Sequence, residues 1–297
     1  MNSTGSQIEF VRLDELYRGK GLSNAMSVDV EDYFQVSAFE KTVSRSDWDE
    51  MPSRINRNID RVLMIFDEHD TKATFFTLGW VAERFPELIK RIANEGHEIA
   101  SHGYEHSRVT TFQSEDFLED VRSTRELLEQ VSGVEVTGYR APSFSIGASS
   151  LWAHDVLLEA GYQYSSSIFP ISHDHYGLPG APRFPFRTSR QGILEIPPST
   201  LSMFGRNWPC AGGGFFRLFP ISYSKWAIGR INQAESMPAI FYFHPWELDP
   251  KQPRIDGIPR KARFRHYLNL DKFEDRLKAM LVAFEWQTTR SVFLGRA

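Results

Sequence analysis

The sequence predicts an α/β fold in which short β-strands alternate with amphipathic helices around a mostly parallel sheet or barrel. Short runs rich in apolar and β-branched residues recur along the chain, and longer stretches between them carry apolar residues at helical spacing. Side chains that could bind a metal or transfer a proton directly follow several of these runs. Parallel sheets and barrels build their sites at such strand ends, so the same pattern also indicates where a site would lie.

The individual elements follow from these runs in chain order. The expected strands are 25–30, 73–78, 97–100, 136–140, 193–196, 239–244 and 291–294. Helices with one buried face are expected through Ile55, Ile59, Val62 and Phe66, and through Phe117, Val121, Leu128 and Val131.

Residues 170–214 interrupt the alternation. Their prolines remove backbone donors, and the glycines at 212–214 permit unusual dihedral angles. We therefore expect a structured loop insertion here, and a helical extension after Pro250.

The composition excludes several classes of protein. Hydrophobic residues make up 41% of the 297 residues and charged residues 24%, which is ordinary for a globular chain. The net charge of −4 provides no basic field for nucleic acid. No run approaches the roughly 18 apolar residues that span a bilayer, so no transmembrane segment is expected.

Compartment is predicted from the first residues and from cysteine usage. Residues 1–20 include acidic side chains and lack the apolar core of a signal peptide, so the expected location is cytoplasmic. The single cysteine, Cys210, excludes an intrachain disulfide and a cysteine-based zinc site.

The first polar cluster consists of Asp29, near the end of the strand expected at 25–30, and Glu31 and Asp32, which directly follow it. Three carboxylates within four positions repel one another unless a cation or an arginine offsets their charge. A solvated acidic turn is an equally good interpretation of this segment taken alone.

The second cluster contains His102 and His106, four residues apart. On a helical turn this spacing places both imidazoles on one side, where they could share Zn²⁺ or Fe²⁺. Two histidines and one carboxylate would leave positions open for water and substrate, as a catalytic metal requires. A chance pair on the surface is the alternative, and His97, just before the strand core, is expected to be structural.

Two further side chains lie at strand ends. His244 ends the run at 239–244, and as a general acid it would have a pKa near neutrality. Arg140 ends the run at 136–140 and could keep a catalytic carboxylate ionised and oriented. The plainer alternatives are a core hydrogen bond for His244 and a structural ion pair for Arg140.

Together and in this order, these segments resemble the motifs of the polysaccharide deacetylase family, also called the NodB-homology or carbohydrate esterase family four domain. The resemblance covers roughly residues 24–250 and implies a distorted barrel of about seven βα units. It also implies site roles for five residues: Asp29 as catalytic base, His102 and His106 as metal ligands, Arg140 as the tether of the base and His244 as catalytic acid.

The chain departs from the family pattern at two places. The family's adjacent Asp-Asp pair is replaced by Asp29-Val30, so Glu31 or Asp32 must supply the metal carboxylate. Asp32 has the usual shorter side chain, whereas Glu31 would share the Asp29 face of an extended strand. The family's Arg-x-Pro-Tyr ends here in Ser143, whose backbone N–H could still serve in the oxyanion hole.

A narrower likeness joins four segments, which begin at Asp29, Gly205, Gly212 and Arg265. They resemble the deacetylase subfamily found at exopolysaccharide loci linked to exosortase (PEP-CTERM) systems.

From the extent of the family resemblance we expect three parts of the chain. They are an N-terminal segment at 1–23, a polysaccharide deacetylase domain at 24–250, and a helical extension at 251–297 packed on the barrel.

The resemblance implies a hydrolase that removes N-acetyl groups from an N-acetylated glycan with one divalent ion. Zinc is the first choice for this ion, and other divalent transition metals are alternatives. Competing hypotheses are an allantoinase-like amide or cyclic-imide hydrolase of similar fold, a noncatalytic carbohydrate-binding protein and a purely structural scaffold. The aromatic residues Trp208, Phe215 and Trp246 could line a sugar groove or simply pack.

Overall fold

The computed structural model describes residues 10–19, 22–173 and 176–295. Part of the N-terminal segment expected at 1–23, namely residues 1–9 and 20–21, therefore lies outside the described residues. In the described part of this segment, β1 (Val11–Arg12) pairs antiparallel with β7 (Phe186–Arg187), and α1 (Asp14–Tyr17) follows it.

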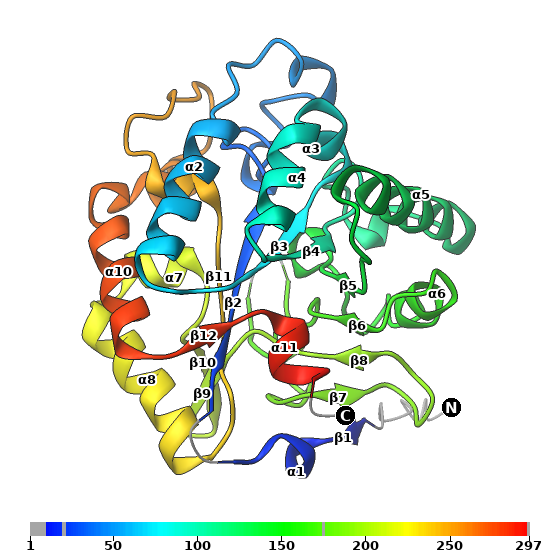
Figure 1. Cartoon of the computed structure of the whole chain (residues 1–297), viewed down its shortest axis with the longest axis vertical. Coiled ribbons are helices and arrows are strands. Elements are labelled where there is room, and N and C mark those ends of the chain that lie inside the picture. The colour runs from blue at the N-terminus through cyan, green and yellow to red at the C-terminus, as the bar shows by residue number, and fades with distance from the viewer. Residues whose placement is uncertain (1–9, 20–21, 174–175, 296–297) are drawn as a thin grey trace, which may run out of the picture.

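A parallel sheet forms the centre of the molecule (Figure 1). Its strands lie in the order β11, β2, β3, β4, β5, β6, β8, and each neighbouring pair is parallel. Their bounds are β2 (Asn24–Val30), β3 (Thr74–Thr77), β4 (Glu98–Ser101), β5 (Gly138–Tyr139), β6 (Tyr164–Ser165), β8 (Leu194–Glu195) and β11 (Ile240–Phe243). Every residue of β2 is buried, as expected for a strand covered on both faces. The predicted α/β class is confirmed, and the arrangement is consistent with a distorted barrel.

Helices cover the outside of the parallel strands (Figure 1). They are α2 (Ile55–Glu68), α3 (Gly79–Arg84), α4 (Pro86–Asn94), α5 (Ser114–Ser132), α6 (Ala153–Glu159) and α8 (Ile221–Ala234). Helices α2 and α5 are the two predicted from apolar spacing. Their predicted core residues are buried, apart from Val131, which is partly buried.

Short 3₁₀ turns connect several of these elements. They are η1 (Ser37–Phe39), η2 (Arg45–Asp47), η3 (Val109–Thr111), η4 (Pro142–Phe144), η5 (Pro245–Leu248) and η6 (Leu270–Lys272).

The insertion expected at 170–214 is more regular than a loop. Besides β7 and β8 it contains a hairpin of β9 (Thr200–Met203) and β10 (Arg206–Pro209), and its last residues begin α7 (Gly213–Leu218). Phe204 and Gly205 form the hairpin turn with positive φ angles of 53° and 72°.

The C-terminal extension contains α9 (Arg260–Tyr267), α10 (Phe273–Ala283), β12 (Trp286–Gln287) and α11 (Thr289–Phe293). The prediction of a strand at 291–294 is wrong, because residues 289–293 form helix α11. Thr288 caps this helix by accepting a hydrogen bond from Ser291 N. The strand lies earlier, at β12, and pairs with β2. The extension is therefore not only helical, and it contributes to the central sheet.

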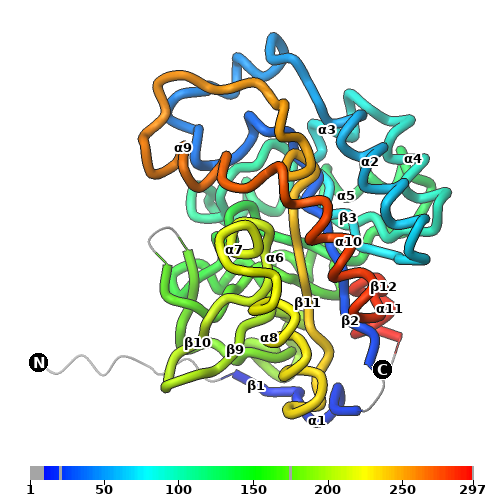
Figure 2. Tube along the Cα trace, turned by 90° about the vertical axis from the view of Figure 1, so that its left-hand side faces the viewer, coloured from blue at the N-terminus to red at the C-terminus, as the bar shows by residue number. Residues whose placement is uncertain are grey.

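Helix α9 returns to the end of the sheet where the parallel strands finish (Figure 2). At this end the ring centroids of Phe39 and His266 lie 4.6 Å apart. This contact links the segment after β2 to the C-terminal extension. A search of the described residues for a helix long and apolar enough to cross a membrane finds none.

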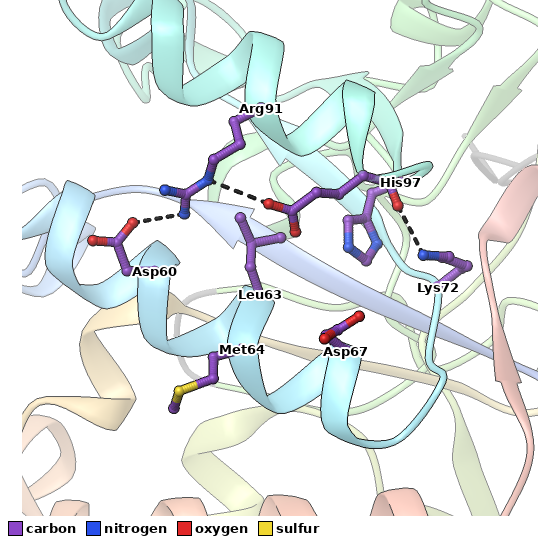
Figure 3. A pocket seen from close by; sticks show the side chains of 8 residues that line it. Asp60, Leu63, Met64, Asp67, Lys72, Arg91 and His97 are labelled. Carbon is purple, nitrogen blue, oxygen red and sulfur yellow. Dashed lines mark hydrogen bonds and ion pairs between the residues drawn. The ribbon is translucent and has the colours of Figure 1, made fainter.

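A surface depression lies between α2 and α4 (Figure 3). It is lined by Asp60, Leu63, Met64, Asp67, Lys72, Arg91, Glu95 and His97. Lys72 lies two residues before β3 and His97 lies one residue before β4, so this depression lies at the end of the barrel opposite the strand ends discussed below. His97 packs here against Phe75, and its Nδ1 lies 3.2 Å from Ala73 N, in keeping with a structural role.

Candidate active site

The polar side chains singled out from the sequence come together at the carboxyl ends of neighbouring parallel strands. Asp29 is the penultimate residue of β2, His102 directly follows β4, Arg140 follows β5, and His244 follows β11. Because these strands are parallel and near one another in the sheet, their ends converge on one region of the barrel.

Arg140 and Asp29 form a fully buried ion pair. Arg140 Nη1 donates to Asp29 Oδ1 at 2.6 Å and to Ser27 Oγ at 2.9 Å. Its Nε and Nη2 donate to the carbonyl and hydroxyl oxygens of Ser166 at 3.2 and 3.0 Å. The guanidinium is thus held on two sides, and its charge-assisted bond fixes the orientation of the Asp29 carboxylate.

Glu31, His102 and His106 form a group that could hold a metal ion. Each offers one ligand atom, and these atoms all lie within 4.8 Å of one another. Glu31 reaches the group because the chain turns directly after β2, where Glu31 N donates to Asp29 O at 3.0 Å. His106 adopts a positive φ of 59°, which is uncommon for a residue other than glycine.

The hydrogen bonds around this group leave acceptor atoms facing one another, which fits a bound cation. His102 Nδ1 lies 2.7 Å from Arg140 O, and because a carbonyl only accepts, Nδ1 carries the proton and Nε2 keeps its lone pair. Glu31 Oε2 is buried and has no hydrogen-bond partner among the described residues, although His106 Nε2 is 2.9 Å away. A divalent ion between these atoms would satisfy both lone pairs.

The electrostatics of the group agree with this arrangement. Burial by itself raises the pKa of Glu31, but the imidazoles of His106, His244 and His102 outweigh it and lower that pKa to about 2. Burial also lowers the pKa of His102 to about 4. An ionised carboxylate and a neutral imidazole are the forms that bind a metal.

Asp32, the other candidate for the metal carboxylate, lies outside this group. Its Oδ2 accepts hydrogen bonds from Ser53 Oγ at 2.7 Å and Arg54 N at 2.8 Å, and its Oδ1 accepts from Tyr33 N at 3.0 Å. These contacts direct Asp32 toward the start of α2, where it holds the chain that enters the helix. Of the two carboxylates left open by the sequence, the structure brings Glu31 to the histidines.

His244 lies between the two carboxylates of the site and a third one behind it. Its Nε2 is 3.6 Å from Glu31 Oε1 and 3.9 Å from Asp29 Oδ2, and its Nδ1 is 3.1 Å from Glu247 Oε2. Burial acts to lower the pKa of His244, but Glu31, Glu247 and Asp29 overcome it and raise that pKa to about 9. The imidazole is therefore protonated at neutral pH, as a general acid must be.

Glu247 and Arg217 support His244, and the sequence analysis did not identify either of them. Arg217 Nε donates to Glu247 Oε1 at 2.7 Å, and both side chains are buried. Glu247 could have been found from its spacing, because a residue three positions after a helix cap often bonds back to it. Arg217 lies 30 positions from Glu247 on α7 and gave no signal.

Ser143, the candidate for the oxyanion hole, sits in a strained turn beside the metal group. Ser143 and Phe144 have positive φ angles of 54° and 49°. The Ser143 hydroxyl contacts that of Ser37, whose Oγ lies 3.5 Å from His106 Nδ1. Left-handed backbone in residues other than glycine is costly and often marks a functional site.

Comparison with known protein families divides the chain into two parts. Residues 39–165 match the polysaccharide deacetylase family, and residues 166–294 match a domain of unknown function, DUF3473. The candidate site draws on both parts, since His102, His106 and Arg140 lie in the first and His244 and Glu247 in the second. Asp29 and Glu31 precede both matches.

Curated relatives match the chain over part of its length. A peptidoglycan-N-acetylglucosamine deacetylase of Bacillus cereus is 37% identical over 94 residues, which cover 31% of this chain and 34% of the relative. A peptidoglycan deacetylase of Helicobacter pylori is 35% identical over 113 residues, which cover 37% of this chain and 36% of the relative. The chain thus spans about a third of the length of these relatives.

A solved structure resembles the whole fold. It is that of a putative polysaccharide deacetylase from Mycobacterium smegmatis, with a TM-score of 0.57 and 21% sequence identity, and the match covers 91% of this chain and 87% of that one. The match confirms the fold predicted for the chain, including the segments on both sides of residue 165.

Proposed function

We propose that this chain is a metal-dependent hydrolase that removes N-acetyl groups from amino sugars of a glycan. Its family match and its relatives support a polysaccharide deacetylase. One observation carries the proposal. Asp29 paired with Arg140 and His244 paired with Glu247 flank the group Glu31, His102 and His106, so residues suited to act as base, acid and metal ligands lie in one site. Binding alone would need neither an acid nor a base.

The chemistry follows from what each side chain can do. A divalent ion held by Glu31, His102 and His106 would polarise the acetamide carbonyl and increase the acidity of water, whose pKa falls from about 15.7 to roughly 7 in good zinc sites. Asp29, held in place by its bond to Arg140, accepts the proton of the attacking water. The Ser143 N–H donates to the developing oxyanion, a contact worth about 3 to 4 kcal/mol where it has been measured.

His244 completes the reaction by giving its Nε2 proton to the leaving amine. Glu247 accepts a hydrogen bond from Nδ1, which orients Nε2 toward Asp29 and Glu31. The C–N bond then breaks, and acetate and a free amino sugar are released.

The motif likeness supports a finer proposal for the substrate and its setting. We infer that the glycan is an N-acetylated exopolysaccharide or its precursor and that zinc is the ion, which suits a group of two histidines and one carboxylate. The two curated relatives are named for peptidoglycan, which also contains N-acetylated amino sugars and is the first alternative substrate.

The proposal is tested by measuring acetate release from N-acetylglucosamine oligomers and by metal analysis of the purified protein. We expect acetate release that a chelator abolishes and zinc restores, and that is lost in His102→Ala. Hydrolysis of allantoin without a metal would support the cyclic-imide alternative. Oligosaccharide binding without acetate release by the zinc-loaded protein would support a noncatalytic homologue.

A further inference from the structure

Trp246 lies beside the candidate metal group but has no role in the reaction described above. It follows His244 by two residues in η5, and its indole is almost fully buried. Its Nε1 lies 3.4 Å from Glu31 Oε1 and donates a hydrogen bond to it.

This contact makes the two oxygens of Glu31 different. Oε1 faces the indole N–H and His244, whereas Oε2 has no hydrogen-bond partner and lies 2.9 Å from His106 Nε2. We propose that Trp246 is a positioning residue for the metal carboxylate: its N–H occupies Oε1 and so reserves Oε2 as a single ligand atom for the ion. This inference rests on the metal site of the proposed function.

The indole is itself held by residues of the C-terminal extension. The ring of His266, on α9, stacks on Trp246 with centroids 4.1 Å apart and planes 16° apart, and that of His244 stacks at 5.1 Å and 17°. His266 Nε2 bonds to Gln252 Oε1 at 2.7 Å, and Gln252 Nε2 donates to Trp246 O at 2.9 Å. The extension therefore fixes both the ring and the backbone of Trp246.

A carboxylate fixed by a hydrogen bond is a better ligand than a free one, because its rotation is already restricted and its second oxygen is satisfied. Loss of such a partner to a metal ligand typically costs about 10 to 100-fold in metal affinity. If Trp246 only packs against its neighbours, removal of its N–H alone would leave the metal affinity unchanged. The N–H is thus the feature to test.

The experiment measures Zn²⁺ affinity by titrating the metal-free protein in competition with a chromophoric chelator. Trp246→Phe removes the N–H and keeps an aromatic ring for the stack. The control is Trp286→Phe, since Trp286 is also buried and its Nε1 donates to Met280 O at 3.1 Å, on β12 away from the site. We expect zinc affinity to fall about 10-fold or more in Trp246→Phe and to stay at the wild-type value in Trp286→Phe.

A second substitution covers loss of ring volume. Benzothienylalanine, introduced at position 246 by nonsense suppression, keeps the size of the indole and replaces the N–H with sulfur, so it should weaken zinc binding in the same way. Wild-type affinity in this variant would overturn the role of Trp246.

The role of Trp246 and the metal site itself can fail separately. If the wild-type protein binds zinc and His102→Ala abolishes that binding, the metal site stands, and only an unchanged Trp246 variant counts against the positioning role. If His102→Ala leaves zinc binding unchanged, the metal site of the proposed function is overturned as well.

Discussion

His244 Nδ1 lies 3.1 Å from Glu247 Oε2, and Glu247 in turn accepts a hydrogen bond from Arg217 at 2.7 Å. Glu247 Oε2 also accepts a hydrogen bond from the backbone N of His244 at 2.9 Å, so one carboxylate fixes both the ring and the main chain of the histidine. The arginine comes from α7 and the histidine from the end of β11. The buried side chains of Arg217 and Glu247 thus form a chain of alternating charges that ends at His244.

Replacement of Glu247 by Gln should shift the alkaline limit of activity to lower pH. Glu247 is one of the groups that raise the pKa of His244 to about 9, and an opposite charge at this distance is worth about 1 pKa unit or more. A general acid works only below its pKa, so activity is lost as the pH rises through that value. We expect the falling limb of the kcat/KM profile to move down by about 1 unit or more. An unchanged limb would show that His244 does not act as the acid.

Asp29→Asn should remove the base while leaving the metal group in place. Removal of a general base typically lowers the rate by about 10²- to 10⁴-fold, and an amide cannot accept the proton of water. Acetate release should fall by that amount, while zinc affinity, measured on the same preparation as the control, stays near the wild-type value. Full activity in Asp29→Asn contradicts the proposed mechanism.

Much of this site could be predicted because strand ends are readable from the sequence. Asp29, His102, Arg140 and His244 each lie at or near the end of an apolar run, and parallel strands bring such positions to one end of a barrel. The fold class and helices α2 and α5 were predicted from hydrophobic period in the same way.

What was missed depends on contacts that no period describes. The turn in which Glu31 N bonds to Asp29 O decides which carboxylate reaches the histidines, and it could not be read from spacing. Arg217 reaches Glu247 only through tertiary packing. The last strand was misplaced because Val292 and Phe293 are apolar in α11 for the same reason that strand residues are apolar, namely burial against the sheet.

Zinc should stabilise the folded protein, since the group of Glu31, His102 and His106 is assembled only by folding. A ligand present at about 100 times its Kd adds about 2.7 kcal/mol to the free energy of unfolding. Urea unfolding with and without zinc measures this gain, and His102→Ala, which lacks one ligand, should show little of it. An equal gain in His102→Ala would place the zinc somewhere else.

Glu31→Gln and Asp32→Asn should separate metal binding from stability. Glu31 supplies a ligand oxygen, so its replacement should weaken zinc binding with the fold retained. Asp32 accepts three hydrogen bonds, two of them from residues at the start of α2, and a buried donor left without its acceptor costs about 1 to 3 kcal/mol. Asp32→Asn should therefore lower the free energy of unfolding of the metal-free protein and leave zinc affinity unchanged. The reverse pattern would assign the metal to Asp32.

The glycines of α7 offer a test of the Glu247 contact that replaces no charged residue. A Cβ built on Gly213 would lie 1.8 Å from Glu247 Oε2, whereas one on Gly214 meets nothing within 4 Å. Gly213→Ala must displace the carboxylate that orients His244, and overpacking of this kind typically costs about 1 to 3 kcal/mol. Gly214→Ala should be neutral or stabilising by up to about 1 kcal/mol, because alanine is the better helix former. Thermal unfolding and acetate release measure the two effects. Because the same methyl group is added at adjacent positions of one helix, a loss of both stability and activity in Gly213→Ala alone would trace the defect to Glu247, and equal behaviour of the two variants would refute that contact.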